Sequence, residues 1–147
     1  MNKSLIIYTD GGARGNPGPA GIGVVISDDT GKIIGQFKKY IGEATNNVAE
    51  YKALILALEE ADKISNFKLQ ISNEISLEIR MDSELVVRQM QGIYKIKEPT
   101  LKLLAQEVLK LRNQFKLVSF SHVRREQNKL ADKLVNEAID AALGITG

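Results

Sequence analysis

The sequence contains no cysteine and no tryptophan, only three prolines, and aromatic residues make up only 5% of it. The absence of cysteine excludes disulfide bonds and thiolate metal ligands, which fits a reducing compartment. The first apolar run, in MNKSLIIYTDGG, is too short for the hydrophobic region of a signal peptide or for a membrane span. We therefore expect a cytoplasmic protein with no membrane partner.

The composition that remains is typical of a globular protein. The chain has 147 residues, of which 44% are hydrophobic and 26% are charged, and no repeat or linker-like stretch divides it. We predict one domain over residues 1–147. The net charge of +2 is too small to decide whether nucleic acid is a partner. A basic surface would have to be local, with Lys95 and Lys97 near Tyr94, or Arg124 beside Arg125, as candidates.

Apolar runs predict three strands in the first part of the chain, over residues 4–9, 21–27 and 32–41. The glycine-rich segment GGARGNPGPAG lies between the first two, and we expect it to form a turn because Pro17 and Pro19 exclude a helix. The short segment DDTGK joins the second strand to the third, so these two should pair antiparallel.

The rest of the chain shows helical and strand periodicity in turn. Helices are predicted over residues 46–63, 84–91, 101–113 and 128–143, and strands over residues 76–82 and 116–122. Thr45 or Asn46 can cap the first helix, and Gly144 can end the last. The order βββαβααβα predicts an α/β fold: a mixed five-stranded sheet, its first three strands antiparallel, with helices on both faces. Residues 65–75 fit neither neighbour and are either an insertion or an early start of the next strand.

Four acidic residues occupy positions that a sheet of this kind would bring together. Asp10 and Asp82 end two predicted strands, and if these strands are parallel neighbours, both carboxylates emerge at the edge where ligands usually bind. We place Glu50 in the first turn of helix 46–63 and Asp132 in the first turn or two of the last helix. Taken singly, each acid is explained as a turn former or a favourable helix-end charge. Together they can point at one place.

Carboxylates that close would repel one another and would stay ionised only beside a compensating charge. Hard divalent cations with oxygen ligands supply that charge. A pair of Mg²⁺ or Mn²⁺ ions ~3.5–4 Å apart can bind the attacking water and the leaving oxygen of a phosphodiester. The four acids therefore predict a two-metal hydrolytic site, which needs no cysteine and no nucleophilic side chain.

Each of these acids lies in a distinctive sequence block. The blocks are TDGGARGNPGPAG, TNNVAEYKAL, MDSELVVRQMQG and HVRREQNKLADKL, in that order. In them, and over nearly the whole chain, the sequence resembles the type 1 ribonuclease H family. The resemblance implies a ribonuclease H-like fold and an endonuclease that hydrolyses the RNA strand of RNA–DNA hybrids, leaving 5′-phosphate and 3′-hydroxyl ends. It implies that the metal-binding and catalytic acids are Asp10, Glu50, Asp82 and Asp132.

The resemblance also implies a surface that binds the hybrid. Its residues would be Gly11, Asn16, Thr45, Asn46, Asn47, Glu84 and Arg125. Contacts to RNA 2′-hydroxyl groups would distinguish a hybrid from duplex DNA, since the 2′-hydroxyl is what separates RNA from DNA. Helix capping is the ordinary alternative for Asn46 and Asn47.

The sequence departs from the family's pattern in three places. Forty positions separate Asp82 from His122, with no tryptophan and no dense Lys/Arg helix between them, so the basic protrusion of some members is expected to be missing. Glu84 stands where relatives often carry glutamine and adds negative charge. The loop RREQN before Asp132 is short. The chain therefore resembles the compact members of the family.

Two residues near the acids could assist catalysis. His122, the only histidine, lies six positions before Asn128, where many family members place an assisting histidine. Arg125 lies in the short loop, where compact members often carry arginine, and its guanidinium can hold a phosphate bidentately. We favour Arg125 as the substrate-side group, with His122 as a catalytic group in support.

Two other functions fit the same residues. One is a nuclease of this fold that acts on double-stranded RNA or on DNA, because fold does not fix substrate. The other is a non-catalytic nucleic-acid-binding module, which the presence of all four acids argues against. In either case we expect a monomer without an obligate protein partner.

Overall fold

A five-stranded mixed sheet forms the centre of the computed structural model, which describes residues 3–67 and 72–145. The strands are β1 (Lys3–Ala13), β2 (Gly18–Asp28), β3 (Ile33–Ala44), β4 (Ile75–Met81) and β5 (Leu117–His122), in the spatial order β3-β2-β1-β4-β5. β1 pairs antiparallel with β2, as β2 does with β3, while β1–β4 and β4–β5 are parallel. The predicted sheet, with its first three strands antiparallel, is confirmed.

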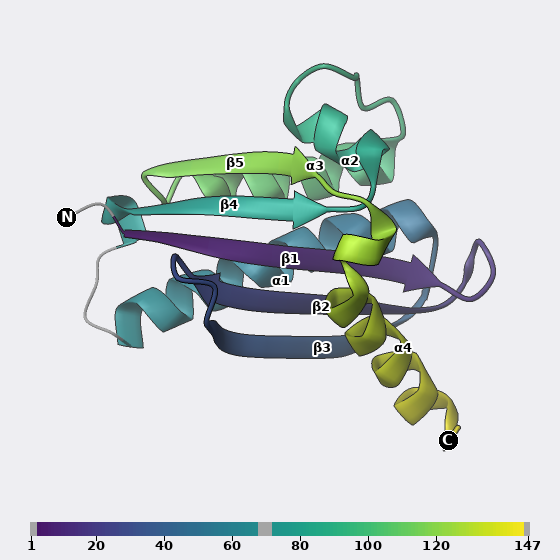
Figure 1. The fold of residues 1–147 in the computed structure, drawn as a ribbon. Helices are drawn as coiled ribbons and strands as arrows, with labels where there is room; N and C mark the ends of the chain where they lie inside the picture. The colour runs from purple at the N-terminus through teal and green to yellow at the C-terminus, as the bar shows by residue number, and fades with distance from the viewer. Residues whose placement is uncertain (1–2, 68–71, 146–147) are drawn as a thin grey trace.

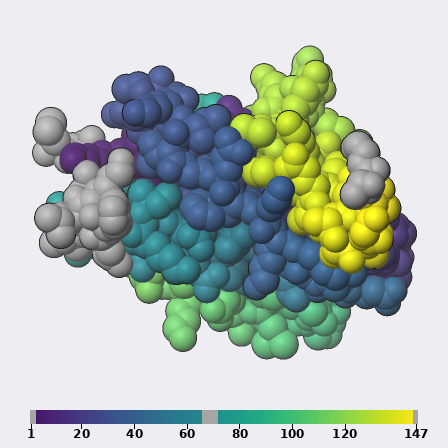
Figure 2. Space-filling model, turned by 90° about the horizontal axis from the view of Figure 1, so that it is seen from below, coloured from purple at the N-terminus to yellow at the C-terminus, as the bar shows by residue number. Residues whose placement is uncertain are grey.

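Helices cover both faces of this sheet, also as predicted. They are α1 (Asn46–Phe67), α2 (Glu84–Met90), α3 (Pro99–Arg112) and α4 (Lys129–Leu143), with 3-10 turns at Ser72–Glu74 and Arg125–Gln127. α4 crosses one face, and α1 and α3 lie together behind the other (Figure 1). In the view from below, β3 (blue) runs between α4 (yellow) and α1 (teal) (Figure 2).

The alternation of side chains along β2 explains the two layers. Val24 and Ile26 point to the main core under α1 and α3, whereas Val25 packs with Ala131 and Leu134 of α4. Successive strand residues face opposite sides of a sheet, so one strand serves both layers. None of the helices in the described ranges combines the length and apolar character that crossing a membrane requires.

The glycine-rich segment is shorter as a turn than we predicted. β1 continues to Ala13 and β2 begins at Gly18, so only residues 14–17 form the turn. Gly11 pairs with Ile22, and Ala13 with Ala20, in the antiparallel ladder. The prediction was wrong here because composition alone assigns glycine to turns, whereas pairing with a neighbouring strand is a tertiary effect.

The described residues of segment 65–75 divide between the end of α1, a 3-10 turn and the first residue of β4, which lies one position before the predicted strand start. An insertion in this segment stays a prediction. α1 extends to Phe67, and the hydroxyl of Ser65 donates a 2.8 Å hydrogen bond to the carbonyl of Ala61, which keeps Ser65 within the helix. Residues 72–74 form a 3-10 turn, and β4 begins at Ile75. Residues 68–71 lie outside the described part of the chain.

Candidate active site

The register of β1 and β4 places two carboxylates side by side. The last parallel pair is Thr9 with Met81, so Asp10 and Asp82 follow at neighbouring positions at the carboxyl ends of this pairing. Asp10 was predicted to end its strand, and this was wrong, because β1 continues alongside β2 to Ala13. β4, the parallel partner of β1, nevertheless ends at Met81, directly before Asp82. Asp82 also accepts a hydrogen bond from the Nδ2 of buried Asn128, at 3.4 Å.

Glu50 comes from α1, which begins beside the β1–β2 turn. Thr45 caps this helix by accepting a hydrogen bond from the N–H of Val48, 3.2 Å away. The first turn of α1 contains no acidic residue, so Glu50 lies one turn further along than we predicted. A Cβ on Gly11 would overlap the backbone of Ala49 and Glu50, so glycine is what lets the helix approach β1 this closely. The N–H of Gly11 then donates to the Glu50 carboxylate.

These three acids form one cluster. Carboxylate oxygens of Asp10, Glu50 and Asp82 lie within 4.8 Å of one another, and Asp10 and Glu50 are buried. Burial, followed by the charges of Asp82 and Asp132, raises the pKa of Asp10 from 3.8 to about 8. Burial and the charge of Asp10 also raise the pKa of Glu50 well above its usual range. Burial and neighbouring charge therefore raise the pKa of both Asp10 and Glu50, the inner pair of acids, and favour their protonated forms.

Asp132 approaches the cluster from the opposite face of the sheet. It lies in the first turn of α4 and is exposed, where the positive end of the helix dipole favours its charge. A Cβ on Gly23 would overlap the backbone oxygen of Ala131, so this glycine lets α4 lie directly on β2. The predicted meeting of strand ends and helix starts thus depends on glycines at two points of close contact.

The chemistry of this donor set fits a divalent cation. The acids offer only carboxylate oxygens, which are the ligands of Mg²⁺ and Mn²⁺. Among the described residues, none of the ion pairs involves any of the four acids. Their mutual repulsion is therefore not compensated by a lysine or arginine, and a bound cation would compensate it.

A cleft of about 420 Å³ surrounds the acids. All four acids line it, together with Gly11, Asn46, Asn47 and Arg125 from the predicted substrate-binding residues. Of the described residues, Asn16, Thr45, Glu84 and His122 are not part of this lining. The structure thus brings four of the seven predicted substrate-binding residues to the acids and leaves the other three, together with His122, outside the lining of the cleft.

The asparagines have structural partners of their own. Asn46 accepts a hydrogen bond from the N–H of Ala13 at 2.9 Å, and its own N–H donates to the side chain of Asn16, also at 2.9 Å. The side chain that caps α1 is that of Thr45, rather than that of Asn46 or Asn47. Asn16 and Asn46 fasten the β1–β2 turn to the start of α1, and Asn47 stands in the cleft.

His122 and Arg125 differ in position. His122 is exposed at the end of β5, beside Met81 in the sheet register. Arg125 lies in the 3-10 turn before α4 and borders the cleft. Glu84 begins α2 with an exposed side chain, 4.0 Å from the guanidinium of Arg88.

Three residues at the site were missed in the sequence. Arg14 and Asn136 line the cleft, and Asn128 donates to Asp82 and to the carbonyl of Thr9. The signal for Arg14 was a charged residue inside a glycine-rich segment. Asn136 and Asn128 carry no local signal, because polar residues at a helix start or on an exposed helix face are common.

Comparison with known proteins agrees with this geometry. Residues 8–138 match the family model described as "Reverse transcriptase-like". The chain is 56% identical to LC11-RNase H1, isolated from compost and crystallised with an RNA/DNA hybrid; the alignment covers 95% of this chain and 99% of that one, with a TM-score of 0.88. The chain belongs to the type 1 ribonuclease H family. Only residues 91–98 connect α2 to α3.

Two curated relatives of this ribonuclease H chain are longer than it is. It is 42% identical to ribonuclease HI of Halobacterium salinarum, over 92% of this chain and 64% of that protein. It is also 42% identical to a bifunctional protein of Mycobacterium tuberculosis, over 94% of this chain and 36% of that protein. The chain therefore spans about a third of the mycobacterial relative, and the prediction of one domain over residues 1–147 stays a prediction.

Proposed function

We propose that this chain hydrolyses the RNA strand of RNA–DNA hybrids, with two Mg²⁺ or Mn²⁺ ions held by the four acids. The observation that carries the proposal is the cluster of Asp10, Glu50 and Asp82, whose oxygens lie within 4.8 Å of one another. Support comes from LC11-RNase H1, a relative at 56% identity that was crystallised with an RNA/DNA hybrid.

Two of the acids, Glu50 and Asp82, are already held in place by hydrogen bonds. Glu50 is held by the N–H of Gly11, and Asp82 by Asn128, so neither has to be ordered when an ion binds. Bound divalent cations would supply Lewis acidity toward the phosphate and charge compensation for the acids. The proposed nucleophile is water, which predicts 5′-phosphate and 3′-hydroxyl ends.

The cleft residues are proposed to recognise the hybrid. Asn47 and the exposed Asn46 border the cleft with amide groups that can donate to, or accept from, a 2′-hydroxyl. Arg125 borders the same cleft and can hold a phosphate with two parallel hydrogen bonds. His122 lies outside the lining, so Arg125 is the better placed of the two.

One gel tests the proposal. Labelled RNA–DNA hybrid, duplex RNA, duplex DNA and single-stranded RNA are incubated with and without Mg²⁺ or Mn²⁺, and the ends of the products are identified. We expect metal-dependent cleavage of the RNA in the hybrid alone, with 5′-phosphate ends. Cyclic-phosphate ends would make the 2′-hydroxyl the nucleophile, and cleavage of duplex RNA or DNA would change the substrate class.

A further inference from the structure

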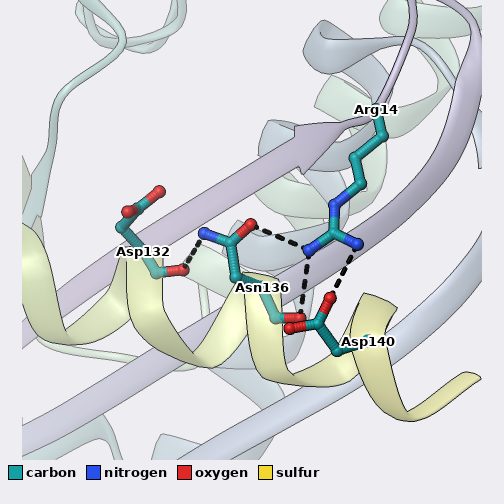
Figure 3. Close-up of polar contacts among 4 residues, drawn as sticks. All are labelled: Arg14, Asp132, Asn136 and Asp140. Atoms are coloured by element: carbon teal, nitrogen blue, oxygen red, sulfur yellow. Dashed lines mark hydrogen bonds and ion pairs between the residues drawn. The ribbon is translucent and has the colours of Figure 1, made fainter. Parts of the chain in front are cut away.

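Arg14 connects the β1–β2 turn to α4 across one side of the cleft (Figure 3). Its Nη1 lies 2.7 Å from a carboxylate oxygen of Asp140. Its Nη2 donates to the side-chain oxygen of Asn136 at 3.2 Å and to the Asn136 carbonyl at 3.5 Å. The planar guanidinium thus engages two turns of α4 at once, which a lysine ammonium with its single charged atom cannot reproduce.

The same network reaches the fourth acid. The Nδ2 of Asn136 donates to the carbonyl of Asp132 at 3.1 Å, so the amide of Asn136 links Arg14 on one side to Asp132 on the other (Figure 3). Asp132, Asn136 and Asp140 follow one another at intervals of four, which places them on one side of the helix. Arg14 and Asn136 also line the cleft.

The start of α4 needs such support. Asp132 lies in the first turn of α4 with an exposed side chain, so burial does not fix the position of its carboxylate. The residue before the helix, Asn128, makes no side-chain capping hydrogen bond, because its amide is turned to Thr9 and Asp82. The start of α4 therefore has no side-chain cap, and contacts further along the helix add to those of Asn128.

We propose that Arg14 is a positioning residue: its contacts with Asp140 and Asn136 fix α4 on the β1–β2 hairpin so that Asp132 completes the metal site. The proposal rests on the proposed function for its kinetic consequences only. Asp132 is the acid that depends on Arg14, since Asp10 lies within β1 and Glu50 is held by Gly11. Loss of Arg14 should therefore weaken cation binding without removing the inner acids.

Direct binding of a substrate phosphate by Arg14 is the competing role, and the two roles predict different kinetics. A positioning residue changes kcat and the metal requirement, whereas a phosphate contact changes KM and its salt dependence. A substitution of Asp140 distinguishes the two roles further. Its loss breaks the positioning contact, but it would free Arg14 for a phosphate.

The experiment compares Arg14→Met, Arg14→Lys and Asp140→Asn with a matched control, Lys38→Met. Lys38 of β3 also pairs with α4, through Glu137 at 3.3 Å, but it does not border the cleft. The Mn²⁺ dissociation constant of each metal-free protein is measured by titration calorimetry, which requires no activity. kcat, KM and the Mn²⁺ concentration for half-maximal rate are then measured on the hybrid, and melting curves verify that each variant is folded.

We expect Arg14→Met and Asp140→Asn to weaken Mn²⁺ binding and lower kcat by roughly tenfold, the range seen for residues that orient metal ligands, with Arg14→Lys little better. KM should change by less than about twofold, and Lys38→Met should behave like wild type. A raised KM in Arg14→Met with normal Mn²⁺ binding would overturn the proposal, as would an equal effect of Lys38→Met. If wild type cleaves no hybrid, the proposed function fails, and the calorimetry still decides on Arg14.

Discussion

Two of the four acids are buried, and they differ from the exposed Asp132 in what sets their position. The inner pair, Asp10 and Glu50, is buried, and its geometry is set by the sheet and by the close contact of α1 with Gly11. The outer acid, Asp132, is exposed on a helix that polar surface contacts help to hold. The inner pair is therefore preorganised at a cost in stability, because like charges are crowded in a buried place. The outer acid costs little, but its position depends on distant residues.

The largest difference should appear in activity when the inner pair is neutralised. We expect Asp10→Asn and Glu50→Gln each to lower kcat more than about a hundredfold, or ~2.7 kcal/mol of barrier, because each removes a ligand that no neighbour can replace. Glu59→Gln, an exposed change on the same helix, is the control. A variant that retained more than about a tenth of wild-type turnover would remove that acid from the metal site.

The assisting group comes next in size. Arg125 borders the cleft and His122 does not, so we expect Arg125→Ala to lower kcat/KM by roughly thirtyfold and His122→Ala by less than about threefold. The reverse order of the two losses would assign the supporting role to Arg125.

Neutralising the outer acid should have a smaller effect than neutralising the inner pair. Asp132→Asn keeps an oxygen ligand at an exposed position that water can share, so we expect a loss of about tenfold in kcat, ~1.4 kcal/mol. Excess Mn²⁺ should recover part of this loss in Asp132→Asn and none of it in Asp10→Asn. Equal losses of kcat in Asp132→Asn and Asp10→Asn, with no recovery in excess Mn²⁺, would mean that Asp132 and the inner pair act as one unit.

The stability of the metal-free protein should also distinguish the inner pair from Asp132. The pKa of Asp10 is raised from 3.8 to about 8, so the folded state binds a proton that the unfolded chain releases. The stability that protonation of Asp10 gives the folded state is fully present below the pKa of 3.8 in the unfolded chain. It is lost as the pH rises through the folded-state pKa of about 8. Asp10→Asn should therefore stabilise the metal-free protein at pH 8.5 by at least ~1 kcal/mol, a few degrees in Tm, and much less at pH 5.

Melting curves at the two pH values, recorded in a metal chelator, measure this effect. Asp132→Asn is the comparison, and its curve should shift little at either pH because its carboxylate is exposed. A gain in Asp10→Asn that does not grow with pH would show that the inner charges are not crowded.

The smallest effect is expected outside the cluster. Glu84 is exposed close to Asp82 and Ser83, so Glu84→Gln should lower KM for the hybrid by about twofold at low salt, and the gain should vanish at high salt. Glu107→Gln, an exposed change on α3, should alter nothing. A gain that persisted in high salt would indicate a direct contact rather than a through-solvent charge.

Local pattern in the sequence was enough to predict much of the fold and of the acidic site. The alternation over residues 76–82 and the helical spacing after Asn46 predicted β4 and α1, and Pro99 and Gly144 marked a helix start and a helix end, as the structure confirms. The meeting of Asp10 and Asp82 followed from parallel strands, which share one carboxyl edge. These features depend on the spacing of apolar side chains along the chain and on the backbone restrictions of proline and glycine. Both are local properties of the sequence.

Tertiary structure alone decided how far each element extends and which polar groups serve the acids. The strands run into the glycine-rich segment because ladder hydrogen bonds are available there, and Glu50 lies against β1 because Gly11 admits the helix backbone. The contacts of Arg14 join residues more than a hundred positions apart, so no local pattern could signal them. Sequence determines what a residue can do chemically, whereas the packing of distant segments determines which neighbours it acts on.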